Sequence, residues 1–211
     1  MRKYLTEFVG TLFFVMTIAL IASRDEAMAP LVIGGALMVV VYMGGHISGA
    51  HYNPAVSLAL CLRGKLARGD LLPYIVAQLA GAAAGALLAC VVSDRTFAPA
   101  PAAGAGAMTV LLVEALYTSL LALVVLNAAT SKGTQGNSFY GLAIGFTIVI
   151  AAWAGGPISG GAYNPAVATG TIVVNVLRGS GDFGHLWLYL VGPLAGGVIG
   201  AQIFRIQEPA G

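Results

Sequence analysis

Residues 47–56 read ISGAHYNPAV and residues 158–167 read ISGGAYNPAV, so eight of ten letters coincide. Both stretches are polar and glycine-rich, yet each lies among alanine, valine, leucine and glycine. Asn-Pro is a helix-start signal, because asparagine is a preferred N-cap residue and proline suits the first helical position. We therefore predict one helix that begins after Asn53 and another that begins after Asn164, each preceded by irregular backbone.

These two helices are too short to cross a bilayer. At 1.5 Å per residue, 54–62 would span about 14 Å and 165–177 about 20 Å, against a hydrocarbon core of roughly 30 Å. The irregular backbone before each helix must then enter the membrane, which is tolerated only where it is buried in protein or lines a watery cavity. The sequence therefore predicts two re-entrant half-helices.

The composition is that of an integral membrane protein. Hydrophobic residues make up 58% of the 211 residues and charged residues 9%, with a mean hydropathy of +0.89. Soluble domains carry about 25% charged residues, because their surface must be hydrated. The net charge of +2, without a basic stripe, argues against a nucleic-acid partner.

Six apolar stretches have the length of transmembrane helices: 5–22, 29–46, 71–92, 107–129, 138–155 and 185–204. If the N-terminus lies inside, the cytoplasmic segments hold seven lysines and arginines and the outer segments three. This asymmetry follows the positive-inside rule. We therefore expect a multi-pass protein of the cell (inner) membrane, with both termini cytoplasmic.

The repeat extends beyond the two decapeptides. Landmarks of three spans recur in the same order: Glu7 and Thr11 match Glu114 and Thr118, and Tyr74, Gly81 and Gly85 match Tyr189, Gly196 and Gly200. Three spans per half force the halves into opposite orientations, and in transport proteins this puts the working site at their interface. We predict one channel domain, 1–211, with halves 1–106 and 107–211; a duplication that serves packing alone is the alternative.

Inverted symmetry would bring the two half-helix N-termini face to face near the midplane. Each carries about +0.5 charge, so together they would repel cations and protons. Carbonyl groups of the extended stretches can then replace the hydration of a neutral solute while the asparagine amides donate. We expect the pore motifs to be Asn53, Pro54, Ala55, Asn164, Pro165 and Ala166, and the carbonyls to come from Gly49, Ala50, His51, Tyr52, Gly160, Ala162 and Tyr163.

The paired Asn-Pro-Ala motifs, together with Glu-x-x-x-Thr in the first and fourth spans, resemble the aquaporin and aquaglyceroporin family over the whole chain. The resemblance implies an all-α membrane fold of six transmembrane helices plus two re-entrant half-helices in an inverted 3+3 repeat. It also implies a homotetramer in the lipid bilayer with one pore per subunit, passive conduction, and loops braced by Glu7 and Glu114.

The resemblance also implies a selectivity filter, and here the chain departs from the family. Most members carry arginine directly after the second Asn-Pro-Ala, whereas this chain has Val167. Counting without gaps, the other filter positions are Ile33, Ala152 and Gly161; a slip of one residue would bring in Trp153 instead. This filter has no charge and no aromatic ring, which predicts a wide, apolar opening.

We therefore expect a passive channel for water and small neutral solutes, such as glycerol, urea, ammonia, peroxide and metalloid hydroxides including arsenite. Two alternatives are a strictly water-selective channel that is narrowed elsewhere and a proton-coupled transporter that uses Glu7 and Glu114. A structural membrane protein with a closed pore is a third.

Other candidate residues carry little chemistry. The three histidines and two cysteines, Cys61 and Cys90, lack metal-ligand spacing, so we expect no metal and no cofactor. His51 is expected to brace its loop, and gating by protonation of His46 is an alternative role for a histidine here. No nucleophile, base and oxyanion site converge, so an enzyme is not expected. Residues 98–106 and 205–211 read as plain connectors.

Overall fold

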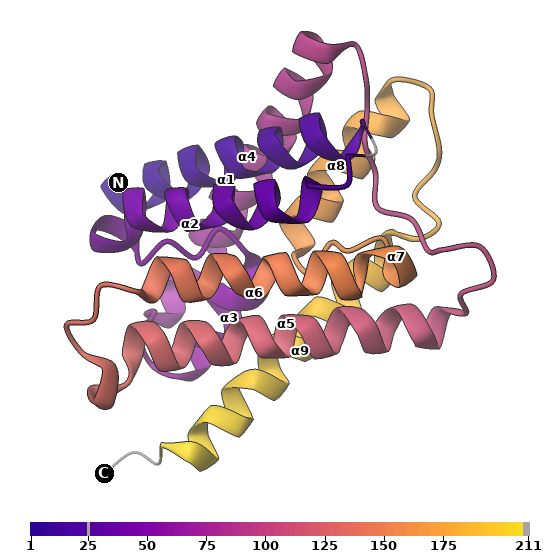
Figure 1. Ribbon diagram of the computed structural model, residues 1–211. Coiled ribbons are helices and arrows are strands. Elements are labelled where there is room, and N and C mark those ends of the chain that lie inside the picture. The colour runs from indigo at the N-terminus through magenta and orange to yellow at the C-terminus, as the bar shows by residue number, and fades with distance from the viewer. Residues whose placement is uncertain (25, 209–211) are drawn as a thin grey trace.

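The computed structural model describes residues 1–24 and 26–208, and all regular elements within these ranges are helices (Figure 1). In chain order they are α1 (Arg2–Ala22), α2 (Ala29–Ser48), α3 (Pro54–Leu62), α4 (Arg68–Ser93), α5 (Ala107–Thr130), the 3-10 turn η1 (Lys132–Thr134), α6 (Tyr140–Ala154), α7 (Gly156–Ser159), α8 (Pro165–Leu177) and α9 (Leu186–Gln207). The predicted all-α membrane fold is confirmed, and α3 and α8 have the predicted bounds.

Within the described part of the chain, five helices are long and apolar enough to cross a membrane: α1, α2, α4, α5 and α9, with 20 to 26 residues each. The predicted fifth span, 138–155, differs, because α6 has only 15 residues. The chain continues as the four-residue α7 after a break at Gly155. Pro157 lacks the N–H that would bond within a continuous helix, which explains the interruption. Together α6 and α7 cover 140–159, the counterpart of the unbroken α2.

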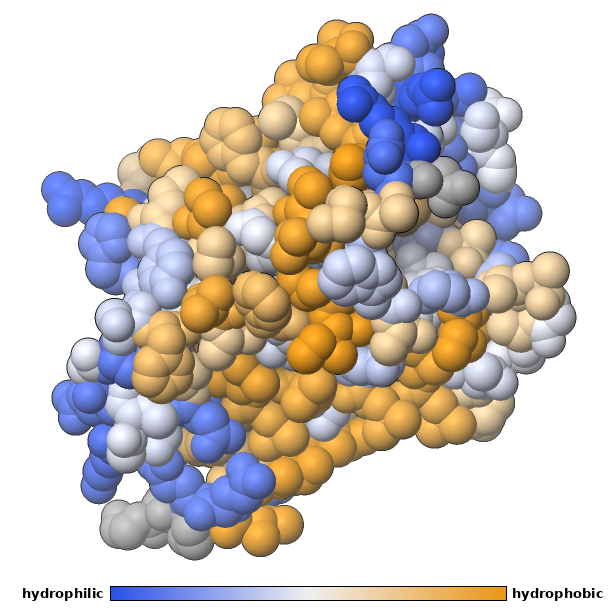
Figure 2. All heavy atoms as spheres, in the orientation of Figure 1, coloured by the Kyte–Doolittle hydropathy of each residue, from blue (hydrophilic) through white to orange (hydrophobic). Residues whose placement is uncertain are grey.

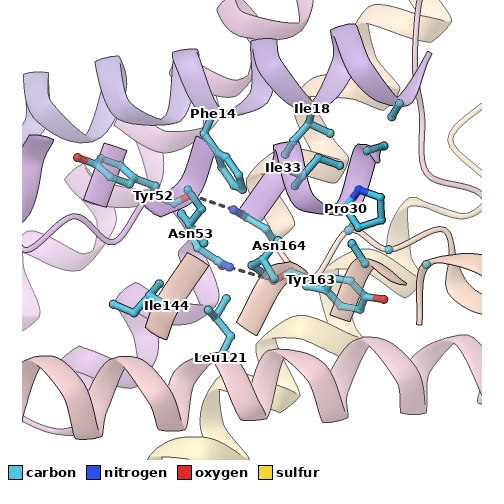
Figure 3. Close-up of a pocket in the computed structure, with 18 of the residues that line it drawn as sticks. Phe14, Ile18, Pro30, Ile33, Tyr52, Asn53, Leu121, Ile144, Tyr163 and Asn164 are labelled. Carbon is cyan, nitrogen blue, oxygen red and sulfur yellow. Dashed lines mark hydrogen bonds between the residues drawn. The ribbon is translucent and has the colours of Figure 1, made fainter. Parts of the chain in front are cut away.

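The N-terminus and the C-terminal end of α9 lie at one end of the bundle, on the left in Figure 1, together with the 131–139 connection between α5 and α6. The 94–106 connection lies at the opposite end. We call these the termini end and the far end. Helices α3 and α8 lie between the long helices, and their N-termini meet near the middle of the bundle (Figures 1 and 3).

Glycines allow the long helices to pack backbone against backbone. A Cβ atom at Gly81 of α4 would lie 2.3 Å from the Phe8 carbonyl oxygen of α1. In the same way, a Cβ atom at Gly196 of α9 would lie 2.3 Å from the Ala115 carbonyl oxygen of α5. Small residues of this kind drive helix association in lipid, where hydrophobicity cannot. Both glycines therefore act in packing, each at the equivalent place in its half.

The surface and the interior have the polarity of a membrane protein. Hydrophobic residues cover the middle of the face shown in Figure 2, and hydrophilic residues gather toward its ends. Large apolar side chains such as Val91, Val92 and Leu116 are exposed. The buried polar residues include Glu7, Gln78 and Glu114, each 0% exposed. The polar groups are therefore concentrated around the half-helices rather than on the flanks.

Candidate functional site

Each asparagine of the two motifs caps its own half-helix. Asn53 has extended backbone, and its Oδ1 accepts a hydrogen bond of 2.8 Å from the amide of Ala55. Asn164 has the same geometry, with a bond of 2.9 Å from the amide of Ala166. The prolines at the first helical position need no partner for an N–H. The carboxamide oxygens are thereby occupied, and the Nδ2 groups are turned toward the opposite loop.

The two loops are joined by reciprocal hydrogen bonds at the centre of the bundle. Asn53 Nδ2 donates to the carbonyl of Tyr163, and Asn164 Nδ2 donates to the carbonyl of Tyr52, both at 2.9 Å (Figure 3). Each amide group retains a second N–H. The innermost carbonyl of each loop is therefore held by the opposite asparagine, while one donor per asparagine is left for a solute.

A buried carboxylate holds the first loop. Glu7 Oε1 accepts from the Ser48 hydroxyl at 2.6 Å and from the amide of His51 at 3.0 Å. Glu7 Oε2 accepts from the amide of Tyr52 at 2.7 Å and from Gln78 Nε2 at 2.8 Å. Buried backbone N–H groups need partners, and this loop has no helix or strand to supply them. Glu7 therefore ties the loop to α1.

The second loop is held in the same way from α5. Glu114 Oε1 accepts from the Ser159 hydroxyl at 2.8 Å and from the amide of Ala162 at 3.1 Å. Glu114 Oε2 accepts from the amide of Tyr163 at 2.6 Å. Thr118, one turn further along α5, donates its hydroxyl to the carbonyl of Tyr163 at 3.3 Å. The amides of Ala162 and Tyr163 and the carbonyl of Tyr163 therefore all have hydrogen-bond partners within the protein.

The tyrosine before each asparagine has a strained backbone. Tyr52 has φ 50° and Tyr163 has φ 49°, in the left-handed region that residues other than glycine rarely occupy. Both side chains are buried, and their hydroxyls donate to the carbonyls of Val40 and Ala151. This conformation directs the N–H of each tyrosine to a glutamate and its carbonyl to an asparagine. The strain is therefore offset by hydrogen bonds on both sides of the residue.

A cavity of about 420 Å³ extends from the far end past both asparagines. One wall is apolar, with Phe14, Ile18, Ile33, Leu121 and Ile144 in Figure 3, and the other is formed by the two loops. Six of the seven residues expected to supply carbonyls line it: Ala50, His51, Tyr52, Gly160, Ala162 and Tyr163. Gly49 instead lines a second cavity at the termini end.

Three of the four expected filter residues, Ile33, Ala152 and Gly161, line the first cavity. Val167 does not line it; this side chain is 2% exposed and packs in the hydrophobic core. Ala55 and Ala166 are also fully buried, and Pro54 and Pro165 are buried at the starts of α3 and α8. Within the motifs, only the asparagines line the cavity.

The second cavity, of about 710 Å³, opens at the termini end. Lys3, His46, Lys65 and Lys132 are among the residues that line it. Beside it, Arg63 Nη2 lies 3.3 Å from Glu208 Oε1. A hydrogen bond with the Ser131 hydroxyl holds the pKa of Glu208 below its usual range. Among the described residues, three lysines and one carboxylate, that of Asp70, line this cavity, so basic groups outnumber acidic ones there.

Sequence reasoning missed several residues around the loops. Gln78 donates to both Glu7 and Ser57, and Phe97 lines the first cavity from the connection between α4 and α5. The stretch expected to be a plain connector is also anchored, because the amide of Ala102 donates to the carbonyl of Ile158 at 3.1 Å. The one sequence signal for these residues was a polar glutamine, Gln78, within an otherwise apolar span, which indicates a buried hydrogen-bonding role.

Comparisons with known proteins agree on one family. The family model described as "Major intrinsic protein" matches residues 1–204. "Aquaporin NIP1-1" of Zea mays is 34% identical over 97% of this chain and 74% of that protein. "Glycerol uptake facilitator protein-like 6" of Lactiplantibacillus plantarum is 34% identical over 98% of each. The solved aquaglyceroporin from Plasmodium falciparum has the same fold, with a TM-score of 0.86, 23% identity, and coverage of 96% of this chain and 94% of that one.

Proposed function

The chain belongs to the major intrinsic protein family, and from this membership we propose that it conducts a broad range of small neutral solutes through a wide, apolar filter. It is a passive membrane channel for water and small solutes such as glycerol. Members of this family are channels and not enzymes. The broader solute range proposed here includes urea, ammonia, peroxide and metalloid hydroxides such as arsenite.

The observation that carries the channel mechanism is the pair of reciprocal asparagine–tyrosine bonds. These bonds support a site where two half-helix N-termini converge, each equivalent to about +0.5 charge. A neutral solute can accept a hydrogen bond from an asparagine N–H there, whereas a cation meets an unfavourable potential. The site residues are then the two Asn-Pro-Ala motifs, with Glu7 and Glu114 as the braces of their loops.

The broad range of solutes rests on the chemistry of the first cavity. Among the described residues that line it, none is a lysine or an arginine. The proposed filter consists of Ile33, Ala152, Gly161 and the position of Val167, and it lacks the arginine of most family members. Without a charged donor, the loop carbonyls supply the polarity, and the two small residues leave room for solutes larger than water.

We further propose a homotetramer in the cell (inner) membrane, with both termini cytoplasmic and two inverted halves, 1–106 and 107–211. The basic residues beside the second cavity support the cytoplasmic orientation of the termini end. The paired glutamate braces support the two halves, because Glu7 and Glu114 make matching bonds to matching loops.

Stopped-flow light scattering on proteoliposomes tests this function. Water, glycerol and urea gradients are compared with protein-free vesicles, and arsenous acid and ammonia follow. Entry of glycerol and urea well above bare lipid is the expected result. Fast water with all solutes excluded would favour a strictly water-selective channel. Flux driven by a pH or voltage gradient would favour the proton-coupled transporter.

A further inference from the structure

Of the residues that the structure describes, four line both cavities: Val41 of α2, His51 of the first loop, Val125 of α5 and Ile144 of α6. We call them the inner ring. All four side chains are buried, with 3%, 7%, 7% and 5% exposed. Because each comes from a different element, they surround the junction where one cavity ends and the other begins.

The inner ring has a counterpart toward the far end. The repeat offset is 111 residues for the loops and for α2 and α6, and 107 residues for α1 and α5. These offsets relate the inner ring to an outer ring that lines the first cavity and consists, in the same order, of Ala152, Ala162, Ile18 and Ile33. Two positions are branched aliphatic residues in both rings. At the other two, the inner ring has Val41 and His51 where the outer ring has alanine. The inner ring therefore places more side-chain volume around the same frame.

We propose that the inner ring is the narrowest point of the channel and sets the upper size limit of its solutes. This inference rests on the proposed function, and it moves solute selection from the far end of the pore to the side of the asparagines that faces the termini.

The chemistry of the ring defines the solutes that pass. Three of its side chains are aliphatic, and the fourth, His51, has its Nδ1 3.0 Å from the Ser57 hydroxyl. His51 Nε2 is then the one side-chain group of the ring that is left to hydrogen-bond a solute. Small solutes that need few simultaneous hydrogen bonds, such as water, ammonia, peroxide and urea, pass easily. Longer polyols, which must shed several water molecules at once, are held back.

Matched variants of the two rings test the proposal in proteoliposomes. Ile144→Ala and Val41→Ala widen the inner ring, and Ile33→Ala, at the position equivalent to Ile144, widens the outer ring by the same volume. Fluxes of water, glycerol and xylitol are measured for each. We expect the xylitol-to-water ratio to rise on the order of 10-fold in the inner-ring variants, which lose two (Val41→Ala) or three (Ile144→Ala) carbon atoms from the ring. Ile33→Ala changes a filter position but leaves the inner ring intact, so the ratio should rise less in this variant than in Ile144→Ala.

The outcomes separate the two proposals. A rise in Ile33→Ala with none in Ile144→Ala or Val41→Ala overturns the inner ring and leaves the channel function standing. A rise in the xylitol-to-water ratio that appears in the inner-ring variants and is smaller or absent in Ile33→Ala supports the ring. No flux above bare lipid in any correctly folded protein, judged by size-exclusion chromatography, overturns both proposals. If Ile144→Ala does not fold, Val41→Ala alone decides, because it removes only two methyl groups.

Discussion

The two loops share one backbone design and differ in the layer of side chains behind it. In both, a serine, two loop amides and a buried glutamate form the same set of bonds. Behind the first loop, Gln78 adds a donor to Glu7 and another to Ser57, which contacts His51. The equivalent positions behind the second loop, 193, 168 and 162, are proline, alanine and alanine. The bonds from the glutamate to the serine and the two amides, which we call the glutamate frame, therefore fix each loop. The side chains behind the frame set how polar the surroundings of the loop are.

Removing either glutamate should have the largest effect on this shared frame. Glu7→Leu would leave two amides, the Ser48 hydroxyl and Gln78 without their acceptor, and Glu114→Leu would leave two amides and the Ser159 hydroxyl. Each buried donor without a partner costs roughly 1–3 kcal/mol. We expect both variants to unfold at a lower temperature than the wild type, with the larger drop in Glu7→Leu. Thermal unfolding in detergent measures this, and a greater loss in Glu114→Leu would contradict the role given to Gln78.

Val167→Arg probes whether the second loop can narrow the pore. The arginine cannot remain in the apolar core where Val167 packs, so it should turn into the first cavity, where it adds bulk, charge and donors. We expect glycerol and urea fluxes to fall on the order of 10-fold, with water less affected. Val167→Leu, which adds volume without charge, is the control in the same stopped-flow assay. Unchanged solute flux in Val167→Arg would show that this position does not face the conduction path.

Gln78→Met isolates the layer that only the first loop possesses. Methionine keeps the length of the side chain but removes the donors to Glu7 and Ser57. The loss should be roughly 1–3 kcal/mol, because these buried acceptors lose a partner. The free energy of unfolding in detergent is the measurement. Wild-type stability in Gln78→Met would mean that the extra layer does not support the loop.

The smallest effect is expected from the tyrosines behind the loops. The Tyr74 hydroxyl donates to the Ser48 carbonyl at 2.7 Å, and the Tyr189 hydroxyl donates to the Ser159 carbonyl. Tyr74→Phe and Tyr189→Phe each remove one such bond and keep the aromatic ring. Each should therefore lower the free energy of unfolding, measured in detergent, by about 0.5–1.5 kcal/mol. Similar losses of stability in the two variants would show that the two tyrosines support their loops equally. A loss in one alone would show that the halves are held differently.

The sequence predicts what depends on local signals. Asn-Pro marks the starts of α3 and α8, and a fixed separation pairs the loops with their glutamates. The break after α6 was not predicted, because Gly155 and Pro157 lie within a stretch that reads as one apolar span. The burial of Val167 depends on which face of α8 packs against its neighbours. The inner ring also escapes local reasoning, because its four members come from four elements that meet only in the folded bundle.

The reciprocal asparagine bonds have a consequence for how the chain is made. The partner of the Asn53 amide is the carbonyl of Tyr163, 110 residues later in the chain. At about 5–20 residues per second, a ribosome needs roughly 5–20 s to add those residues. During that interval the first loop is in the membrane with its central donor unmet, so its final conformation must await the second half. Biogenesis of this protein should therefore end with the docking of its two loops. A nascent chain stopped before residue 164 should remain sensitive to proteases at the first loop.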